Sequence, residues 1–295
     1  STMNKIQIMN HTTTHPHGHF FTNKQQSLEF LRISKCGSSS FANNLNLTTW
    51  LKFNKTKGNA IKLACLRDPY SRFISSIPET LKRLNSKKEH NDDVVVDEKV
   101  ILMLRSCSMS NADEVLHAFT STIEALGYFD AHHEPQTHFF LNPDGSIGFD
   151  AKCFPLDQMN RVLKILGGSI EKHNDRSNAL SRIQSDSLRD ILKTKLGLVG
   201  LYKRNRHFLP LDKNSLQYHF VTKYNAEFRI HQNQRAQMIH SLAVLFRELK
   251  KIQSSTSYIE FIQRYYSKDI ELFEKIKGTK EIKELSTLPN FSHLY

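Results

Sequence analysis

The sequence predicts an α/β fold in which a parallel central sheet is flanked by helices. Apolar runs at about 28 to 33 and 60 to 66 have the length and composition of buried strands, and each leads into a helical pattern. Strands that alternate with helices are typical of parallel sheets. The chain of 295 residues is 39% hydrophobic, which is enough for a core of this kind.

The first part of the chain supplies the sheet and its first helices. Residues 1 to 26 are polar, so we expect a flexible segment before a single domain over 27 to 295. After the first strand, "FANNLNLTTWL" favours a short helix. The second strand ends at "RDPYSRFISSI", where Asp68 and Pro69 favour the start of a helix that runs to about 85.

The rest of the chain is predicted to be mainly helical. The segment "THFFLNPDGSIGFD" is the exception, because two extended runs around Pro143 and Gly145 are typical of a hairpin. Apolar periodicity predicts helical additions at about 93 to 105, 111 to 126, 155 to 166, 186 to 196 and 212 to 275.

Composition restricts the class of protein and its location. No apolar run approaches the ~20 residues of a membrane span, and the start lacks a secretion signal. The 4 cysteines are too irregularly spaced for a zinc site or a disulfide scaffold, so we expect free thiols. These features favour a cytoplasmic protein, or one from the Golgi lumen if a membrane anchor precedes the sequence. The formal net charge of +12 would attract an anionic partner, but it is spread without a dense basic tail.

The first strand leads into "SKCGSSS", whose residues suit a tetrahedral anion. Lys35 supplies a mobile positive charge, and Gly37 lets the main chain approach a ligand closely. Backbone N–H groups and the start of the next helix would converge on the same anion, in a P-loop-like strand–loop–helix cradle. The lysine precedes the glycine, so the loop is not a Walker P-loop. The candidate anion ligands are Lys35, Cys36, Gly37, Ser38, Ser39 and Ser40.

Taken alone, the loop after the first strand fits an ordinary turn equally well. The second strand, however, is also followed by residues that can bind an anion. Arg67 stands at the tip of the second strand, where a guanidinium can hold a phosphate with two hydrogen bonds, and Ser75 and Ser76 follow in the helix. Two anion sites on neighbouring strand ends suit a ligand with a phosphate at each end. The best candidate is 3'-phosphoadenosine-5'-phosphosulfate (PAPS).

Four segments resemble motifs of the PAPS-dependent sulfotransferases, in the order in which that family has them. "ISKCGSSSF" resembles the 5'-phosphosulfate loop, and "RDPYSRFISS" resembles the 3'-phosphate motif R-D-P-x-x-R-x-x-S. "DAHHEPQTHFFLNPDG" and "YSKDIELF" are similar to segments of the branch that contains the Golgi-type carbohydrate sulfotransferases and their bacterial relatives. Ser34 and His133 depart from the family pattern, and about 175 to 255 matches none of its motifs.

The resemblance implies a sulfotransferase-type fold and transfer of a sulfuryl group from PAPS to an acceptor hydroxyl, with adenosine 3',5'-bisphosphate as the second product. It implies a carbohydrate acceptor, no nucleic acid partner and no metal. Lys35 would neutralise charge on the leaving phosphate, and Arg67 with Ser75 would hold the 3'-phosphate. His132 is the first candidate for the general base and His133 the second, with a purely structural histidine as the alternative.

Two other functions and several structural roles stay open. A P-loop-type nucleotide kinase would use a similar cradle, but the sequence lacks the Walker lysine and the magnesium ligands. A non-catalytic basic module would bind RNA or anionic glycans through charge alone, which leaves the order of the two phosphate motifs unexplained. Gln136 is expected to orient the loop or the acceptor. The structural alternative for Asp68 is a helix cap, and that for Arg72 is an ion pair within the helix. Tyr266 and Asp269 are expected to close a carboxyl-terminal helix onto the core.

Overall fold

The computed structural model describes residues 19–23, 25, 27–45, 47, 49–52, 59–84, 104, 111–129, 131–167 and 240–295. These residues fall into two compact units. The first contains the described residues up to Ser76, those from Leu126 to 167 and those from Gln253 to the end. The second contains those from Ile77 to Ala125 and from 240 to Ile252. The expectation of a single domain over 27 to 295 stays a prediction.

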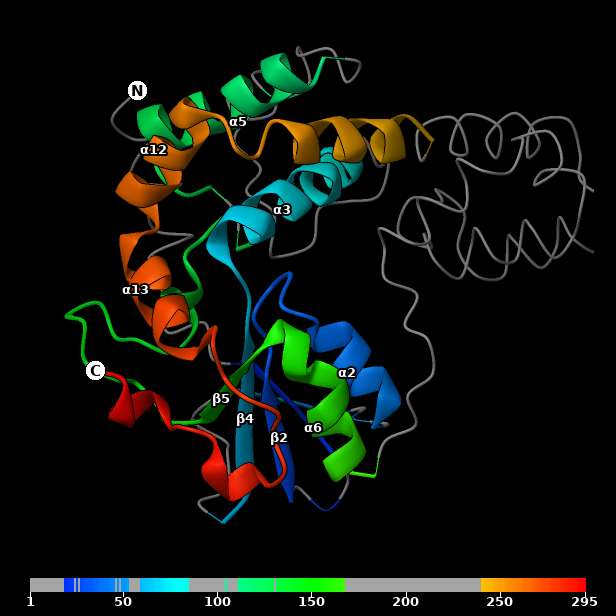
Figure 1. Ribbon diagram of the computed structural model, residues 1–295, viewed down its shortest axis with the longest axis vertical. Coiled ribbons are helices and arrows are strands. Elements are labelled where there is room, and N and C mark those ends of the chain that lie inside the picture. Colours follow the sequence, from blue (N-terminus) through cyan, green and yellow to red (C-terminus); the bar gives the residue numbers. More distant parts are fainter. Residues whose placement is uncertain are drawn as a thin grey trace, which may run out of the picture. The chain divides into compact units, whose positions relative to one another are not determined.

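A five-stranded sheet forms the centre of the first unit (Figure 1). Its strands are β1 (His19–Thr22), β2 (Leu28–Leu31), β3 (Thr49–Lys52), β4 (Ile61–Leu66) and β5 (Lys152–Pro155), in the spatial order β3-β1-β2-β4-β5. β4 is parallel to β2 and to β5, whereas β1 is antiparallel to β2 and to β3. The sheet is therefore mixed: the prediction of a parallel sheet is correct for β2, β4 and β5 and wrong for β1.

β1 lies within the segment that was expected to be flexible. Phe20 and Phe21 are both buried there, each in a different hydrophobic core. The turn to β2 is held by Asn23, whose side-chain oxygen accepts a hydrogen bond from the N–H of Ser27 at 2.9 Å. The polar residues around the two phenylalanines concealed this strand from the sequence analysis, and residues 1 to 18 lie outside the described part.

One face of the sheet is covered by two short helices, α2 (Ser38–Asn44) and α6 (Met159–Ile165). Figure 1 shows the two helices side by side next to the sheet. Phe30 of β2 stacks on Phe41 of α2 with ring centroids 3.9 Å apart, and Phe154 of β5 lies 6.3 Å from Phe41. This aromatic core fixes α2, and therefore the loop that precedes it, against the sheet.

The opposite face of the sheet is buried as well. Adjacent residues of a strand point to opposite sides of the sheet, so each strand contributes side chains to a core on both faces. Leu31, Ala64 and Cys153 belong to a second core, which includes Leu272 of α13 (Ser267–Ile276). Phe140 also lies in this core, where it stacks on Phe291 with centroids 3.7 Å apart. Helices and irregular segments on both sides of a sheet give the layered α/β architecture that the sequence predicted.

The helix predicted after the second strand is confirmed as α3 (Pro69–Leu84). Asp68 caps its start: one carboxylate oxygen accepts the N–H of Tyr70 at 3.2 Å and the other accepts the hydroxyl of Ser71 at 2.7 Å. Pro69 occupies the first position, where the N–H that proline lacks would have no helical partner.

The later helices are confirmed where the structure describes them. α5 (Ala112–Leu126) matches one prediction, and α12 (Thr256–Tyr265), α13 and a helix at 240 to 251 match another. The expected helix at 155 to 166 begins with η3 (Leu156–Gln158) and continues as α6. The predictions at 186 to 196 and, apart from Leu104, at 93 to 105 lie outside the described residues. Within the described ranges, no helix combines the length and apolarity needed to cross a membrane.

The hairpin predicted around Pro143 forms only in part. Leu141 and Ile147 pair as an isolated antiparallel bridge, but the residues before them form η2 (Gln136–Phe139), a 3-10 helix. The carboxylate of Asp269 explains the difference, because it accepts the N–H groups of Gln136 at 2.6 Å and Thr137 at 3.1 Å and so fixes a helical turn. β5, which follows the bridge, is a strand that the sequence analysis did not identify.

Candidate functional site

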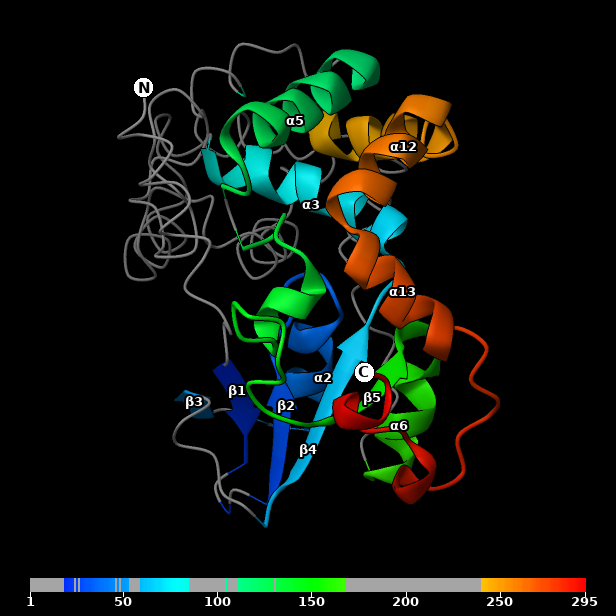
Figure 2. The same ribbon diagram turned by 90° about the vertical axis from the view of Figure 1, so that its left-hand side faces the viewer.

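The two predicted phosphate segments meet at one edge of the sheet. β2 and β4 are parallel neighbours, so their carboxyl ends lie side by side (Figure 2). Residues 34 to 37, the predicted anion loop, follow β2, and Arg67 follows the last residue of β4 directly. In open α/β sheets, ligands bind in the crevice outside the carboxyl ends of the strands. This edge is therefore the candidate site.

The loop after β2 contains two residues with a left-handed backbone. The angle φ is 65° at Lys35 and 74° at Gly37. The N–H of Cys36 between them donates to the carbonyl of Ile33 at 3.2 Å, which closes a tight turn. Left-handed residues in such turns are a feature of backbone nests that bind anions. Glycine adopts this conformation freely, whereas a lysine in it is strained by about 1 kcal/mol or more.

The three serines of the motif lie in the helix and not in the loop. α2 begins at Ser38 with Gly37 as its N-cap, so the loop is shorter than the predicted segment. Ser38 is buried and Ser40 is half-buried, and the carbonyl of Ser40 accepts a hydrogen bond from the side chain of Asn44 at 2.7 Å. The side chain of Ser39 lies outside the described part. A contact between these hydroxyls and an anion stays a prediction.

Arg67 brings three of the predicted site residues together. Its guanidinium Nη1 donates to the carbonyl oxygen of Lys35 at 3.3 Å and to the hydroxyl oxygen of Ser75 at 3.0 Å. The Ser75 hydroxyl in turn donates to the carbonyl of Arg72 at 3.0 Å. A loop, a strand tip and a helix thus contribute to one cluster, in which the half-buried arginine side chain is already oriented.

Gln136 contacts the same two segments. Its Oε1 accepts hydrogen bonds from the N–H of Arg67 at 2.9 Å and from the thiol of Cys36 at 3.2 Å. Its Nε2 donates to the carbonyl of Arg67 at 2.7 Å. The residue is 1% exposed, so these three contacts replace hydrogen bonds to water.

Cys36 contributes to the cluster as a neutral thiol. Burial raises the pKa of the Cys36 thiol to about 11, although the positive charges of Arg72 and Arg67 lower it. The thiol is therefore protonated at neutral pH, and a contact of Cys36 with an anion stays a prediction. Cys65 and Cys153 are also buried free thiols, as predicted, and Cys107 lies outside the described residues.

Arg72 does not form the ion pair within its own helix that the sequence suggested. Its guanidinium is buried and donates from Nε to the carbonyl of Ser34 at 2.8 Å and from Nη1 to the carbonyl of Glu134 at 2.5 Å. Arg72 therefore ties the anion loop to the segment at 131 to 134. This tie was not visible in the sequence, because it joins segments that are far apart along the chain.

The two candidate bases lie in that segment, and both are buried. The imidazole of His133 is fully buried, with its centroid 5.4 Å from the ring of Phe73 and 5.1 Å from that of Phe129. These contacts assign His133 to an aromatic core. The carbonyl of His132 accepts the hydroxyl of Ser76 at 2.7 Å, which attaches the segment to α3. Of the two, His132 stays the first candidate for the base.

Two residues of the carboxyl-terminal motif fasten α13 to the same segment. The hydroxyl of Tyr266 donates to the carbonyl of His133, and the carboxylate of Asp269 accepts the N–H groups of Gln136 and Thr137. Burial raises the pKa of Asp269, while the charge of Arg72 and the two N–H donors lower it. The structural role expected for Tyr266 and Asp269 is confirmed.

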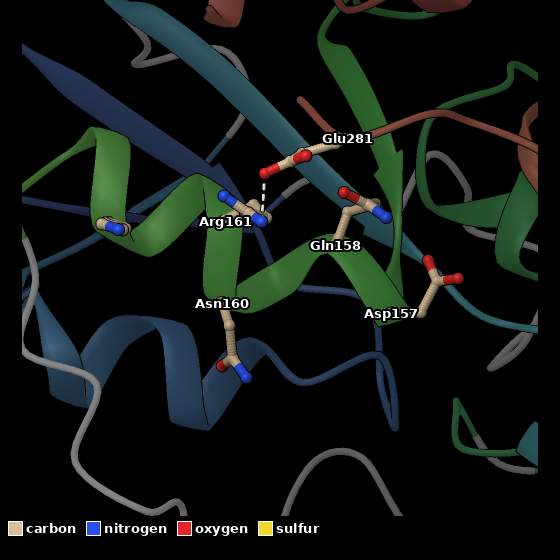
Figure 3. Close-up of a pocket in the computed structure, with 6 residues that line it drawn as sticks. Asp157, Gln158, Asn160, Arg161 and Glu281 are labelled. Carbon is tan, nitrogen blue, oxygen red and sulfur yellow. Dashed lines mark ion pairs between the residues drawn. The ribbon is translucent and has the colours of Figure 1, made fainter. Parts of the chain in front are cut away.

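A surface cavity of about 440 Å³ lies along α6 (Figure 3). Arg161 and Glu281 form an ion pair in its lining, and Asp157 is the second residue after the end of β5. The same elements pack against the anion loop, because a Cβ atom on Gly37 would lie 2.9 Å from Cε of Met159. The position of Asp157 could not be predicted without β5, for which the apolar run "CFP" was the available signal. The lining residues are Asp157, Gln158, Asn160, Arg161, Lys164 and Glu281.

The cluster combines a guanidinium group, a hydroxyl and a tight backbone turn, which are groups that can bind an anion. Among the described side chains, no group of three or more His, Cys, Asp or Glu residues is arranged to hold a metal ion. Comparison of the chain with models of protein families, with curated proteins and with solved structures found no match.

Proposed function

We propose that the chain is a sulfotransferase that moves a sulfuryl group from PAPS to an acceptor hydroxyl on a carbohydrate. The observation that carries this proposal is the pair of hydrogen bonds from the Arg67 guanidinium to Lys35 and Ser75. The bond to Lys35 joins the two predicted phosphate segments, and the bond to Ser75 orients the guanidinium within the second one, which would suit a ligand with a phosphate at each end.

The donor would lie across the carboxyl ends of β2 and β4 in a P-loop-like cradle. Arg67 and Ser75 would hold the 3'-phosphate, since a guanidinium and a hydroxyl are donors that suit its oxygens. The turn at Cys36 and Gly37, with the hydroxyls of Ser38, Ser39 and Ser40, would hold the 5'-phosphosulfate. Lys35 would neutralise the charge that develops on the leaving phosphate.

The reaction is an in-line displacement at sulfur. The acceptor oxygen attacks, the S–O bond to the nucleotide phosphate breaks, and the acceptor hydroxyl loses its proton. His132 is the proposed general base. His133 is less suited to this role, because its imidazole is packed between two phenyl rings.

The two rival functions use the same positive charge in other ways. A nucleotide kinase would bind ATP in preference to a 3'-phosphorylated nucleotide and would need magnesium ligands. A basic RNA- or glycan-binding module would depend steeply on salt and would not discriminate between nucleotides. The Arg67–Ser75 pair favours the sulfotransferase, because neither rival requires a second phosphate site.

The test is incubation of the protein with ³⁵S-labelled PAPS and a panel of glycans and small alcohols. We expect label in a carbohydrate product, and a loss of about 100-fold or more in the Lys35→Ala variant, which lacks the charge opposite the leaving group. Lys251→Ala is the matched control, since it removes an equal charge from a helix surface where the lysine is 64% exposed. Phosphate release from ATP, with no transfer of sulfate to any acceptor, would contradict the proposal.

A further inference from the structure

We infer that Gln136 is a positioning residue that makes the two phosphate segments act as one rigid site for a doubly phosphorylated nucleotide. The inference rests on the proposed function for the identity of that ligand. It goes beyond the proposed function by assigning the coupling between the two phosphates to one side chain that contacts neither of them.

The contacts of the Gln136 amide define this role. Its oxygen accepts from the backbone of Arg67 and from the thiol of Cys36, and its nitrogen donates to the carbonyl of Arg67. The amide oxygen thus joins the residue after β4 to the loop after β2, and the amide nitrogen adds a second hydrogen bond to Arg67. A rotation of this amide would break contacts with both segments at once.

Gln136 is itself held from two directions. Its backbone N–H donates to the buried carboxylate of Asp269 on α13 at 2.6 Å. Two residues earlier, the carbonyl of Glu134 accepts the guanidinium of Arg72, whose Nε also donates to the carbonyl of Ser34. The segment that carries the amide is therefore anchored to a helix and, through Arg72, to the start of the anion loop.

This arrangement bears on affinity because the two phosphates of one nucleotide are a fixed distance apart. Segments that move independently would have to be ordered when the ligand binds, and that entropy loss would weaken binding. If the two segments are already fixed, binding of the second phosphate causes little further loss of conformational entropy. Gln136 should therefore control how much a 3'-phosphate adds to the affinity for a 5'-phosphorylated nucleotide.

A purely structural residue would behave differently. Its loss would lower stability and weaken all nucleotides to a similar extent, without changing the preference between them. Thr22 offers a matched control in the same unit: its buried hydroxyl donates to the carbonyl of Leu28 at 2.8 Å, at the opposite end of β2 from the anion loop. Thr22→Val removes a buried hydrogen bond without touching the site.

The first experiment compares the dissociation constants of adenosine 3',5'-bisphosphate and adenosine 5'-monophosphate in the full-length protein. In Gln136→Met we expect the preference for the bisphosphate to fall roughly tenfold, which corresponds to about 1.4 kcal/mol. Thr22→Val should keep the wild-type preference. An unchanged preference in a folded Gln136→Met protein overturns the inference.

The second experiment measures amide hydrogen exchange of peptides from 33 to 41 and from 66 to 76 without ligand. Gln136→Met should increase exchange in both peptides by roughly tenfold, as expected for local opening. Gln136→Glu keeps an oxygen at the Oε1 position and replaces the Nε2 donor by a second oxygen, so it should loosen the second peptide more, and it decides the question if Gln136→Met does not fold. Wild-type exchange in both variants overturns the inference. Failure of the wild type to bind either nucleotide contradicts the proposed function, while the exchange data still decide the role of Gln136.

Discussion

The backbone conformation of Lys35 bears on the role of the turn between β2 and α2. Its left-handed backbone is unfavourable for a side chain and free of strain for glycine. A turn that served only to join β2 to α2 would be at least as stable with glycine at this position. If the loop binds an anion, as we propose, the positive charge of the side chain supplies a reason for lysine at this position.

Replacement of Lys35 by glycine should therefore separate stability from binding. We expect the free energy of unfolding to stay the same or to rise by up to about 1 kcal/mol, because relief of strain is offset by the greater freedom of glycine in the unfolded chain. Affinity for adenosine 3',5'-bisphosphate should fall at least tenfold, since a hydrogen bond to a charged group contributes about 1.5–3 kcal/mol. Chemical denaturation and calorimetry measure the two quantities.

A matched change at Gly37 should have the opposite effect on stability. The angle φ there is 74°, and a Cβ atom would also approach Met159 and Leu156. Gly37→Ala is expected to lower the free energy of unfolding by about 1–2 kcal/mol. If both variants changed stability in the same direction, the strain assigned to Lys35 would be contradicted.

Cys36 leads to a prediction about pH. Burial raises the pKa of its thiol to about 11, from an ordinary value of 9.0. Only the thiolate reacts with alkylating agents, so Cys36 should react with iodoacetamide more slowly than an unfolded cysteine at about pH 8. The contribution of Cys36 to stability should fall as the pH rises from 9.0 towards 11, because the unfolded state releases the proton first. Mass spectrometry of alkylated peptides tests this, and rapid labelling of Cys36 in the folded protein would contradict it.

At the scale of elements, α3, η2 and α13 are joined by buried polar groups. Arg72 on α3 donates to carbonyls of the anion loop and of the segment before η2, and Asp269 on α13 accepts the N–H groups that start η2. Each group compensates for the burial of the other, because opposite charges in a low-dielectric interior stabilise one another.

Replacement of Arg72 by methionine should destabilise the protein more at neutral than at acidic pH. The lost hydrogen bonds to carbonyls cost about 2–4 kcal/mol at any pH. Burial already raises the pKa of Asp269 above its ordinary 3.8, and removal of Arg72 raises it further. When a carboxyl group has a higher pKa in the folded than in the unfolded protein, its contribution to stability is fully present below the unfolded pKa and is lost as the pH rises through the folded pKa. The loss is larger in the variant, because its Asp269 has the higher folded pKa.

Urea denaturation at about pH 4 and about pH 7 measures this difference. The wild-type protein serves as the reference at each pH, so that only the effect of Arg72 is compared. Equal destabilisation at the two pH values would contradict the electrostatic link between Arg72 and Asp269.

The elements also show what the sequence could and could not predict. β2, β4, α3 and α5 were predictable, because apolar runs, a capping aspartate and regular periodicity are local signals. η2 was not, since it depends on Asp269, which is far away in the chain. β1 and β5 were not predicted either, because polar residues flank their few apolar ones, and only the sheet reveals that Phe20, Phe21 and Phe154 are buried.

The same distinction applies to the candidate site. Lys35, Gly37, Arg67 and Ser75 were identified from the motifs, and the structure places them at one edge of the sheet. The contacts of Arg72 and the packing of His133 were not predictable, because they depend on which segments meet in the fold. The expected acceptor region at about 175 to 255 lies largely outside the described residues.

At the scale of the whole molecule, the net positive charge and the proposed site would act on an anionic nucleotide in different ways. The net charge of +12 would speed the approach of any polyanion, and this effect weakens as salt increases. A site with two positioned phosphate segments would discriminate between nucleotides even where the general attraction is screened. The account therefore predicts selectivity that persists in salt.

The most direct measurement is calorimetric titration with adenosine 3',5'-bisphosphate and with the 5'- and 3'-monophosphates, at about 0.15 M salt. The account predicts that the bisphosphate binds at least tenfold more tightly than either monophosphate. It also predicts that Lys35→Ala selectively weakens the 5'-monophosphate and Arg67→Met selectively weakens the 3'-monophosphate. Equal affinities for all three nucleotides, or equal losses in both variants, would show that the two strand ends do not hold opposite ends of one ligand.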